Sequence, residues 1–245
     1  MPIVLDQSVR PEDRFLSAFE VNQGNTLNGQ SAPIARHRRR AIERFAELGL
    51  PTNRLEAWKY TNIAKALDRP YALQLAPETP TLVAADLDPF LIDGLNAHRL
   101  VLVNGRLDET LSDVGDLPEG VVVSSLEQAG RSHPEVVEAH YGEYADSENE
   151  ALTALNTAFV QDGAFVYVPK GTIVEKPIFV LHVAVAEEDL FIQPRNLFVV
   201  EEGGIAKIVE AQHSRGTAHA FTNLVAEAFV GRGGPLDHSV IQGEG

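Results

Sequence analysis

Four of the eight histidines lie in the C-terminal third of the sequence, where a metal or acid–base site would be sought: His182, His213, His219 and His238. No two of them have the i, i+4 spacing that brings two ligands together on a helix, and a predicted turn separates His213 from His219. His238 shares a predicted strand face with Leu236 and Val240, so we expect partial burial and one satisfying hydrogen bond. The spacing predicts four independent histidines, solvated or hydrogen-bonded, and no metal-binding residue.

The other residue types predict no catalytic or cofactor-binding residue either. The 245 residues include no cysteine, which excludes disulfides, zinc–thiolate sites, thiol nucleophiles and iron–sulfur clusters held by the chain's own thiolates. The acidic runs 187–189 and 201–202 fall in predicted connections between strands, where solvated charge is the ordinary case. The pairs Gly203-Gly204 and Gly233-Gly234 are followed by neither Lys-Ser/Thr nor a helix pattern, so we predict turns rather than nucleotide-binding loops.

One short cluster has residue types suited to binding: Glu56, Trp58, Lys59 and Tyr60. Trp58, the only tryptophan, and Tyr60 offer rigid apolar area of the kind that anchors protein contacts. The same aromatic pair, beside basic Lys59 and Arg54, equally suits docking of the N-terminal region onto the chain's own β region. Both interpretations stay open, so the cluster is a candidate partner-contact or internal docking motif.

The charge of the chain excludes several classes of partner. Acidic residues number 35 against 20 basic ones, a net charge of −15 that repels phosphate backbones and anionic membranes. The excess is uneven, because residues 1–70 hold 11 basic and 8 acidic side chains while the remainder hold 9 and 27. Neither a targeting sequence nor a run of about 20 apolar residues is visible. We expect a cytoplasmic protein that binds neither nucleic acid nor membrane.

Residues 1–70 are predicted to form a helical module. The spacing of Phe15, Leu16 and Phe19 places them on one helix face. A second helix is predicted from Ser31 to Gly49, with its apolar side formed by Ile34, Ile42, Phe45 and Leu48. Its other side is basic and carries Arg36, Arg38, Arg39, Arg40 and Arg44. We interpret this side as a solvated helix face, and contact with an acidic partner is the second interpretation.

Residues 71–162 are predicted to be a mixed α/β segment, with the module boundary in the Pro-rich stretch 68–98. Strands are expected at 100–103, before an Asn104-Gly105 turn, and at 120–123. Ser125 is positioned to cap a short helix over 126–129, and further helices are predicted over 134–141 and 148–160. The last one should place Leu152, Leu155 and Phe159 on one face.

Residues 163–245 are predicted to be entirely β, with short apolar strands separated by Gly-rich turns. One face of 178–185 and one face of 224–230 are wholly apolar, so both should contact a shared core. Ile178 and Ile205 are 27 residues apart, as are Leu197 and Leu224, which fits a repeated two-strand rung. We favour a parallel β-helix over a β-sandwich because hairpin signals such as Asn-Gly are absent after residue 105.

Several motifs resemble the SufB/SufD family of iron–sulfur cluster assembly proteins. The more specific is ALNTAFVQDGAFVYVPKGTIVEKPIFVL at 154–181, and LPTNRLEAWKYTNI at 50–63 resembles the signature that marks the SufD side of the family. Shorter matches are LVLVNGR at 100–106, LPEGVVVSSL at 117–126, PRNLFVV at 194–200 and LDHSVIQGE at 236–244. The resemblance therefore runs from about residue 50 to residue 244.

The resemblance implies a mainly β protein with N-terminal helices, in which a small helical and mixed module precedes a right-handed parallel β-helix core. It implies a non-enzymatic scaffold that works with a SufB-type paralogue and a SufC-type ATPase, with the iron–sulfur cluster handled by the complex and no cofactor held by this chain alone. Family members continue with further rungs and a helical domain, so we expect this sequence to be a shortened form and transfer no metal ligand to it.

Two other functions that solenoid folds carry have less support in these residues. A β-helix enzyme acting on acidic polysaccharide would need several carboxylates and a base converging on one face, whereas the acids here are scattered. A hexapeptide-type acyltransferase would need a six-residue apolar and glycine repeat, which the sequence lacks. The polysaccharide enzyme stays as the alternative to the scaffold.

Overall fold

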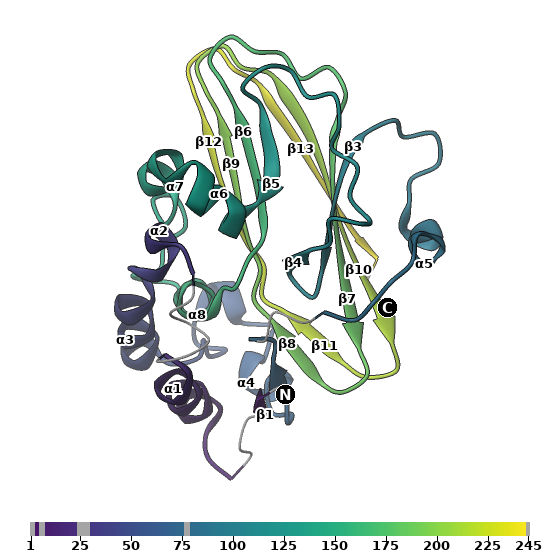
Figure 1. The fold of residues 1–245 in the computed structure, drawn as a ribbon. Coiled ribbons are helices and arrows are strands. Elements are labelled where there is room, and N and C mark those ends of the chain that lie inside the picture. The colour runs from purple at the N-terminus through teal and green to yellow at the C-terminus, as the bar shows by residue number, and fades with distance from the viewer. Residues whose placement is uncertain (1–2, 5–7, 24–29, 76–78, 244–245) are drawn as a thin grey trace.

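The computed structural model describes residues 3–4, 8–23, 30–75 and 79–243, whose strands form three sheets (Figure 1). Sheet I has the order β4 (Arg106–Leu107), β3 (His98–Val103), β7 (Ile178–Ala186), β10 (Ala206–Gly216), β13 (Leu236–Gly243). Sheet II has the order β5 (Val122–Ser125), β6 (Ala164–Val168), β9 (Arg195–Val200), β12 (Val225–Val230). Sheet III has the order β1 (Ile3–Val4), β2 (Ala72–Leu73), β8 (Leu190–Ile192), β11 (Ala220–Thr222). The fold therefore combines helices with sheets of mixed parallel and antiparallel pairing.

From β7 onward the chain visits the sheets in a repeating order, I, III and II. Each strand pairs in parallel with the strand one circuit later, so that Ile178 pairs with Ile208 and Arg195 with Val225. These pairs are 30 residues apart, so the predicted 27-residue repeat is wrong. Ile205 and Leu224 each lie one residue before a strand, β10 and β12, so neither is the first residue of the strand that it was predicted to start.

The helices lie mainly on one side of the sheets, with α5 on the opposite side (Figure 1). The N-terminal ones are α1 (Pro11–Asn22), α2 (Ala32–Ala35), α3 (Arg38–Leu48), the 3₁₀ turn η1 (Glu56–Trp58) and α4 (Ile63–Ala66). The later ones are α5 (Ala84–Leu87), the 3₁₀ turn η2 (Asp88–Phe90), α6 (Leu126–Ser132), α7 (Pro134–His140) and α8 (Ala151–Phe159). No helix within the described residues combines the length and apolar character needed to cross a membrane.

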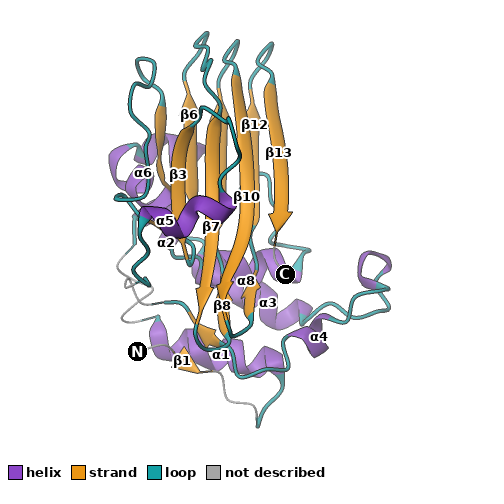
Figure 2. Cartoon of the chain, turned by 90° about the vertical axis from the view of Figure 1, so that its right-hand side faces the viewer, coloured by secondary structure: helices purple, strands orange, loops and turns teal. Residues whose placement is uncertain are grey.

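Sheets I and II enclose an apolar interior, and sheet I is covered on its outer side as well. Val180 contacts the interior cluster, whereas its neighbour Leu181 contacts the cluster beneath the α5 region, which is why β7 is apolar on both faces. Figure 2 shows the strands β3, β7, β10 and β13 of sheet I side by side. Helices α6 and α7 cover the outer face of sheet II, where Leu126 and Val137 pack against Leu197.

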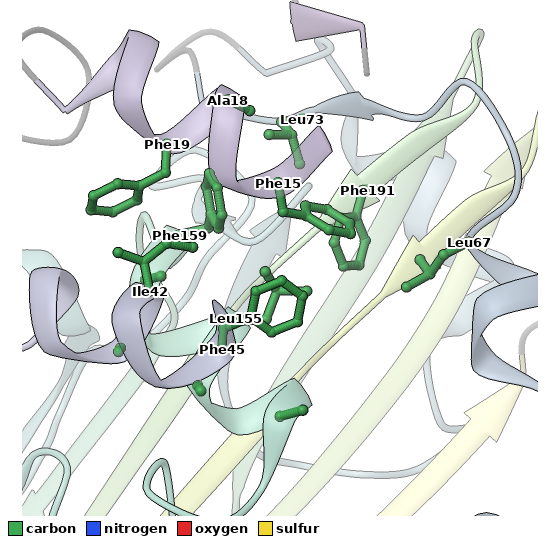
Figure 3. Close-up of a cluster of buried hydrophobic side chains, with 14 of the residues drawn as sticks. Phe15, Ala18, Phe19, Ile42, Phe45, Leu67, Leu73, Leu155, Phe159 and Phe191 are labelled. Carbon is green, nitrogen blue, oxygen red and sulfur yellow. The ribbon is translucent and has the colours of Figure 1, made fainter. Parts of the chain in front are cut away.

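A cluster of aromatic rings joins the N-terminal helices to α8 (Figure 3). Phe15 of α1 contacts Phe45 of α3 at a ring-centroid distance of 5.9 Å, and Phe159 of α8 at 6.2 Å. Phe19 meets Phe159 edge to face at 5.8 Å. Phe191 of β8 completes the contact at 5.3 Å from Phe15. The predicted apolar faces of the first and last helices are therefore confirmed, and they pack against each other.

Local signals in the middle of the chain are confirmed. Asn104 and Gly105 both have positive φ angles, 49° and 78°, and join β3 to β4 in an antiparallel hairpin. The Ser125 side chain accepts a hydrogen bond from the Gln128 backbone N–H and caps α6. Gly49, with φ 65°, ends α3 as predicted.

Two expectations about single elements are wrong. The helix predicted from Ser31 to Gly49 is broken between Ala35 and Arg38 into α2 and α3. The apolar face predicted for 224–230 is exposed at Ala226, Ala228 and Val230, while Glu227 between them is buried. Among the described residues β12 is the outermost strand of sheet II, so its interior-facing side chains have no strand beyond them.

Candidate functional site

The cluster singled out from the sequence lies at and just after η1. Trp58 is half-buried and packs against the cluster of α1, α3 and α8, whereas Tyr60 is 91% exposed. The Lys59 ammonium lies over the Tyr60 ring, 5.5 Å from its centroid. The two aromatic residues therefore have different surroundings: Trp58 contacts the chain itself and Tyr60 projects into solvent.

Trp58 also forms one wall of a groove of about 450 Å³. Asn149, Glu150 and Ala151, which lie at and just before the start of α8, also line the groove. The apolar lining residues include Leu50, which is buried, and Leu55, which is 53% exposed. This volume lies in the range of ligand-binding pockets, so the Trp58 cluster borders a surface able to hold a side chain or short segment.

Replacing Trp58 with alanine is expected to lower the free energy of unfolding by about 1–2 kcal/mol, less than the cost at a fully buried aromatic position. The loss is expected because the indole fills the space between η1 and the helical cluster. Urea denaturation of W58A provides the measurement. The matched control is Y60A, where the exposed ring should change stability by less than about 0.5 kcal/mol. Equal stability of W58A and the parent chain would contradict an internal role for Trp58.

The four histidines have unequal surroundings. His219 is exposed, and His213 stacks on Phe90 at a centroid distance of 4.8 Å. His182 and His238 both contact a polar group around Glu210, so the prediction of four independent histidines is wrong for this pair. The His238 side chain is 27% exposed, which agrees with the predicted partial burial. Within the described residues, no three His, Asp or Glu side chains are grouped so that they could hold a metal ion.

The polar group joins three successive strands of sheet I to sheet II. His182 lies on β7, Glu210 on β10 and His238 on β13. Asn196 of β9 donates from Nδ2 to His182 Nε2 and to Glu210 Oε2, each at 3.1 Å, and its Oδ1 accepts from the Ala164 N–H at 2.9 Å. Because Nε2 accepts, the proton of neutral His182 is on Nδ1. His238 Nε2 lies 3.3 Å from Glu210 Oε2.

Burial lowers the pKa of His182 from its ordinary 6.5, because the imidazolium would lose its hydration, although the Glu210 carboxylate opposes this shift. Burial also opposes ionisation of Glu210, yet the hydrogen bond from His238, the electrostatic interaction with the His182 imidazole and the hydrogen bond from Gln212 hold its pKa below the ordinary 4.5. Both depressed values mean that the unfolded chain binds more protons than the folded one as the pH falls.

The free energy of unfolding is therefore expected to fall as the pH decreases below 6.5, because His182 takes up a proton more readily in the unfolded chain than in the folded one. It should fall further below pH 4.5, where the same holds for Glu210. Urea midpoints measured across this range should fall less steeply below pH 6.5 for H182Q than for the parent chain. The control H219Q alters an exposed histidine and should keep the parent slope. Parallel curves for H182Q and the parent would contradict the assignment.

A buried ion pair that sequence reasoning missed fastens α8 and the segment after α7 to sheet II. The side chains of Arg195 and Glu227 are fully buried and meet at 2.7 Å. Arg195 also donates to Asn156 Oδ1 at 3.3 Å and Thr157 Oγ1 at 3.1 Å, and its guanidinium lies 5.1 Å from the Tyr141 ring centroid. Asn156 and Thr157 belong to the motif at 154–181, and Arg195 belongs to the motif at 194–200. These two motifs were therefore the sequence signal that marked this network.

Glu227 and Asn156 extend this network to the backbone. Glu227 accepts hydrogen bonds from three consecutive or near-consecutive N–H groups, those of Gly142, Tyr144 and Ala145, at 2.9–3.1 Å. The Asn156 Nδ2 donates to the carbonyls of Pro194 and Asn223, both at 2.8 Å. Glu227 thus satisfies backbone N–H groups of the segment after α7, and Asn156 satisfies carbonyls at the corners where β9 and β12 begin, so the role of both side chains is structural.

Arg36, which directly follows α2, and several arginines of α3 pair with acids of the same chain. Ion pairs join Arg36 to Glu138 at 3.1 Å, Arg39 to Glu20 at 2.9 Å and Arg40 to Glu148 at 2.8 Å. These three side chains are half-exposed, but the interpretation as a solvated face is wrong for Arg38. Arg38 is 3% exposed and donates to the carbonyls of Ala158 and Val160.

The turn predictions for the glycine pairs and acidic runs are confirmed. Gly203 and Gly233 have φ angles of 70° and 71° and lie in the connections before β10 and β13. The acids of 187–189 lie between β7 and β8, and those of 201–202 between β9 and β10. Each run therefore belongs to a connection between strands.

Comparison with known proteins connects these motifs to one family. The sequence model described as "SufBD protein N-terminal region" matches residues 9–180. An iron–sulfur cluster assembly SufBD family protein of Synechocystis sp. is 27% identical over 237 residues, which cover 92% of this chain and 51% of the relative.

Two Bacillus subtilis proteins are also similar. The iron–sulfur cluster assembly protein SufD is 28% identical over 213 residues, which cover 83% of this chain and 47% of SufD. The iron–sulfur cluster assembly protein SufB is 26% identical over 125 residues, which cover 51% of this chain and 27% of SufB. The chain spans about half the length of the curated relatives it matches over most of its residues.

Proposed function

The chain belongs to the SufBD family, and from this we propose that it is a non-enzymatic scaffold subunit of a complex that assembles iron–sulfur clusters. The observation that carries the proposal is the family match over residues 9–180, together with similarity to SufD over 83% of the chain. The partners we propose are a SufB-type paralogue and a SufC-type ATPase. The cluster is the cargo of the complex.

We also propose that the strands from β6 onward form a parallel β-helix. The repeating course through sheets I, III and II and the 30-residue offset between paired strands support this fold. So does the apolar interior between sheets I and II, which each further circuit extends. The division into a helical module (1–70), a mixed α/β segment (71–162) and a β core (163–245) is part of the same proposal.

The composition supports a proposal in which a partner supplies the thiolates that bind the cluster. The 245 residues contain no cysteine, and iron–sulfur clusters are held mainly by cysteine thiolates. Buried polar side chains such as Arg195 and Asn156 are occupied in holding strands and helices together. A division of labour in which this chain supplies structure and its paralogue supplies thiolates fits both observations.

The test is co-purification. The tagged native gene product, co-expressed with the SufB-type and SufC-type proteins of the same organism, should elute with both as one species in size-exclusion chromatography. An excess of untagged chain should compete for them, which serves as the control for non-specific retention. Failure of the intact gene product to bind either partner would overturn the proposal.

A further inference from the structure

We propose that the groove between η1 and the start of α8 binds an extended segment of a partner protein that carries an apolar side chain beside a lysine or arginine. The groove is formed by residues 48–52, 55–58 and 149–151. This inference goes beyond the scaffold function and does not depend on it, because it is argued only from the walls and charges of the groove.

The apolar part of the groove is open to solvent. Leu48 is 37% exposed and Leu55 is 53% exposed, although both are leucines of an otherwise well-packed helical region. The half-buried Trp58 ring and buried Leu50 continue this apolar lining inward. Tyr60, which is 91% exposed, stands two residues beyond Trp58. Neighbouring exposed aromatic and leucine side chains are characteristic of protein interfaces.

The charge of the residues that line the groove indicates the charge of the segment that would bind there. Among the residues that the structure describes, Glu56 and Glu150 are the ionisable ones that line the groove, and no lysine, arginine or histidine does. No hydrogen bond or ion pair engages either carboxylate within the described part of the chain. The nearby acids differ, because Glu148 pairs with Arg40 and Arg44, and Glu47 pairs with Arg44. Two unpaired carboxylates at an apolar groove complement a cation beside an apolar side chain.

The size of the surface favours a peptide segment over a small amine. The groove volume of about 450 Å³ accommodates more than one side chain, and the exposed ring of Tyr60 adds apolar surface two residues beyond the lining residue Trp58. An isolated ammonium would engage the carboxylates and leave this apolar surface exposed. A segment with a central leucine and flanking lysines contacts both.

Trp58 provides the measurement, because it is the only tryptophan and lines the groove. Capped heptapeptides with the central sequences Lys-Leu-Lys, Glu-Leu-Glu and Lys-Ala-Lys are titrated to millimolar concentration while the Trp58 emission is recorded. We expect a saturable change with Lys-Leu-Lys, and at least about tenfold weaker binding of Glu-Leu-Glu, since two attractive charge contacts become repulsive.

Two variants test the assignment of residues. E56Q/E150Q should weaken Lys-Leu-Lys binding by about two- to fivefold per carboxylate, whereas E187Q/E188Q, which removes two exposed acids of the β7–β8 connection, should leave it unchanged. L55A should weaken binding without altering the urea midpoint, and V83A, at a comparably exposed position, should alter neither.

Several outcomes would overturn the proposal. These are no saturable change with any peptide, equal binding of Lys-Leu-Lys and Glu-Leu-Glu, and full affinity in E56Q/E150Q. Binding of n-butylamine as tight as that of Lys-Leu-Lys would mean a small-amine site. Self-association of the chain that is lost in L55A would identify the occupant as a second copy. Because co-purification with Suf-type partners is a separate measurement, either proposal can fail while the other stands.

Discussion

Replacing Glu227 with glutamine is expected to lower the free energy of unfolding by about 3–5 kcal/mol, one of the two largest effects of a single substitution that this structure predicts. The Arg195 guanidinium would keep its charge in a site where both side chains are fully buried. A buried charge without its partner loses hydration and gains no compensating attraction. Urea denaturation followed by circular dichroism measures the loss.

The control is an ion pair of the same length on the surface. Lys170 and Glu202 also meet at 2.7 Å, but their side chains are 74% and 56% exposed, so E202Q should cost less than about 1 kcal/mol. In a double-mutant cycle, R195M/E227Q should be less destabilised than the sum of its single variants, because the unpaired charge is removed. Similar losses in E227Q and E202Q would contradict the assigned importance of burial.

Replacing Phe159 with alanine should lower the free energy of unfolding by about 3–5 kcal/mol. Phe159 is 1% exposed and touches both Phe15 and Phe19 of α1, so its removal leaves a cavity at the contact between the N-terminal helices and α8 (Figure 3). The same denaturation experiment measures the effect.

Two variants separate the cavity from a general effect of substitution on this region. F159L should recover much of the loss, since leucine refills most of the space. V21A, on helix α1 like Phe15 and Phe19 but at a position 73% exposed, should stay within about 0.5 kcal/mol of the parent chain. A loss in F159A no larger than in V21A would show that the aromatic cluster contributes little to stability.

Local signals predicted many of the elements that position these residues. The 3–4 spacing of Phe15, Leu16 and Phe19 predicted α1, and Ser125 and Gly49 marked real helix ends. The Gly-rich turns and apolar strands predicted the β character after residue 163. These predictions succeed because helix periodicity, caps and turn conformations depend on residues within a few positions of one another.

The period of the strands and the use of the polar residues were not predictable in this way. The 30-residue offset between Ile178 and its partner Ile208 depends on the lengths of the connections between strands. An apolar residue in such a connection, such as Ile205, looks like the start of a strand in the sequence. Asn156, Arg195 and Glu227 are separated by more than 30 residues from one another in the sequence, and each has an unremarkable local context. The matches at 154–181 and 194–200 marked the first two without giving their roles.

The sequence by itself determined the residue inventory and the family. Its 245 residues contain no cysteine and so supply no thiolate of their own, and its motifs at 50–63 and 154–181 resemble the family to which the chain belongs. Only the tertiary structure decided which charged side chains have a partner among the described residues and which do not. Arg38, predicted to be solvated, is buried against α8, while Glu56 and Glu150, from distant segments, line one groove without partners among the described residues. Burial and pairing depend on which distant segments pack together, and no local pattern encodes that.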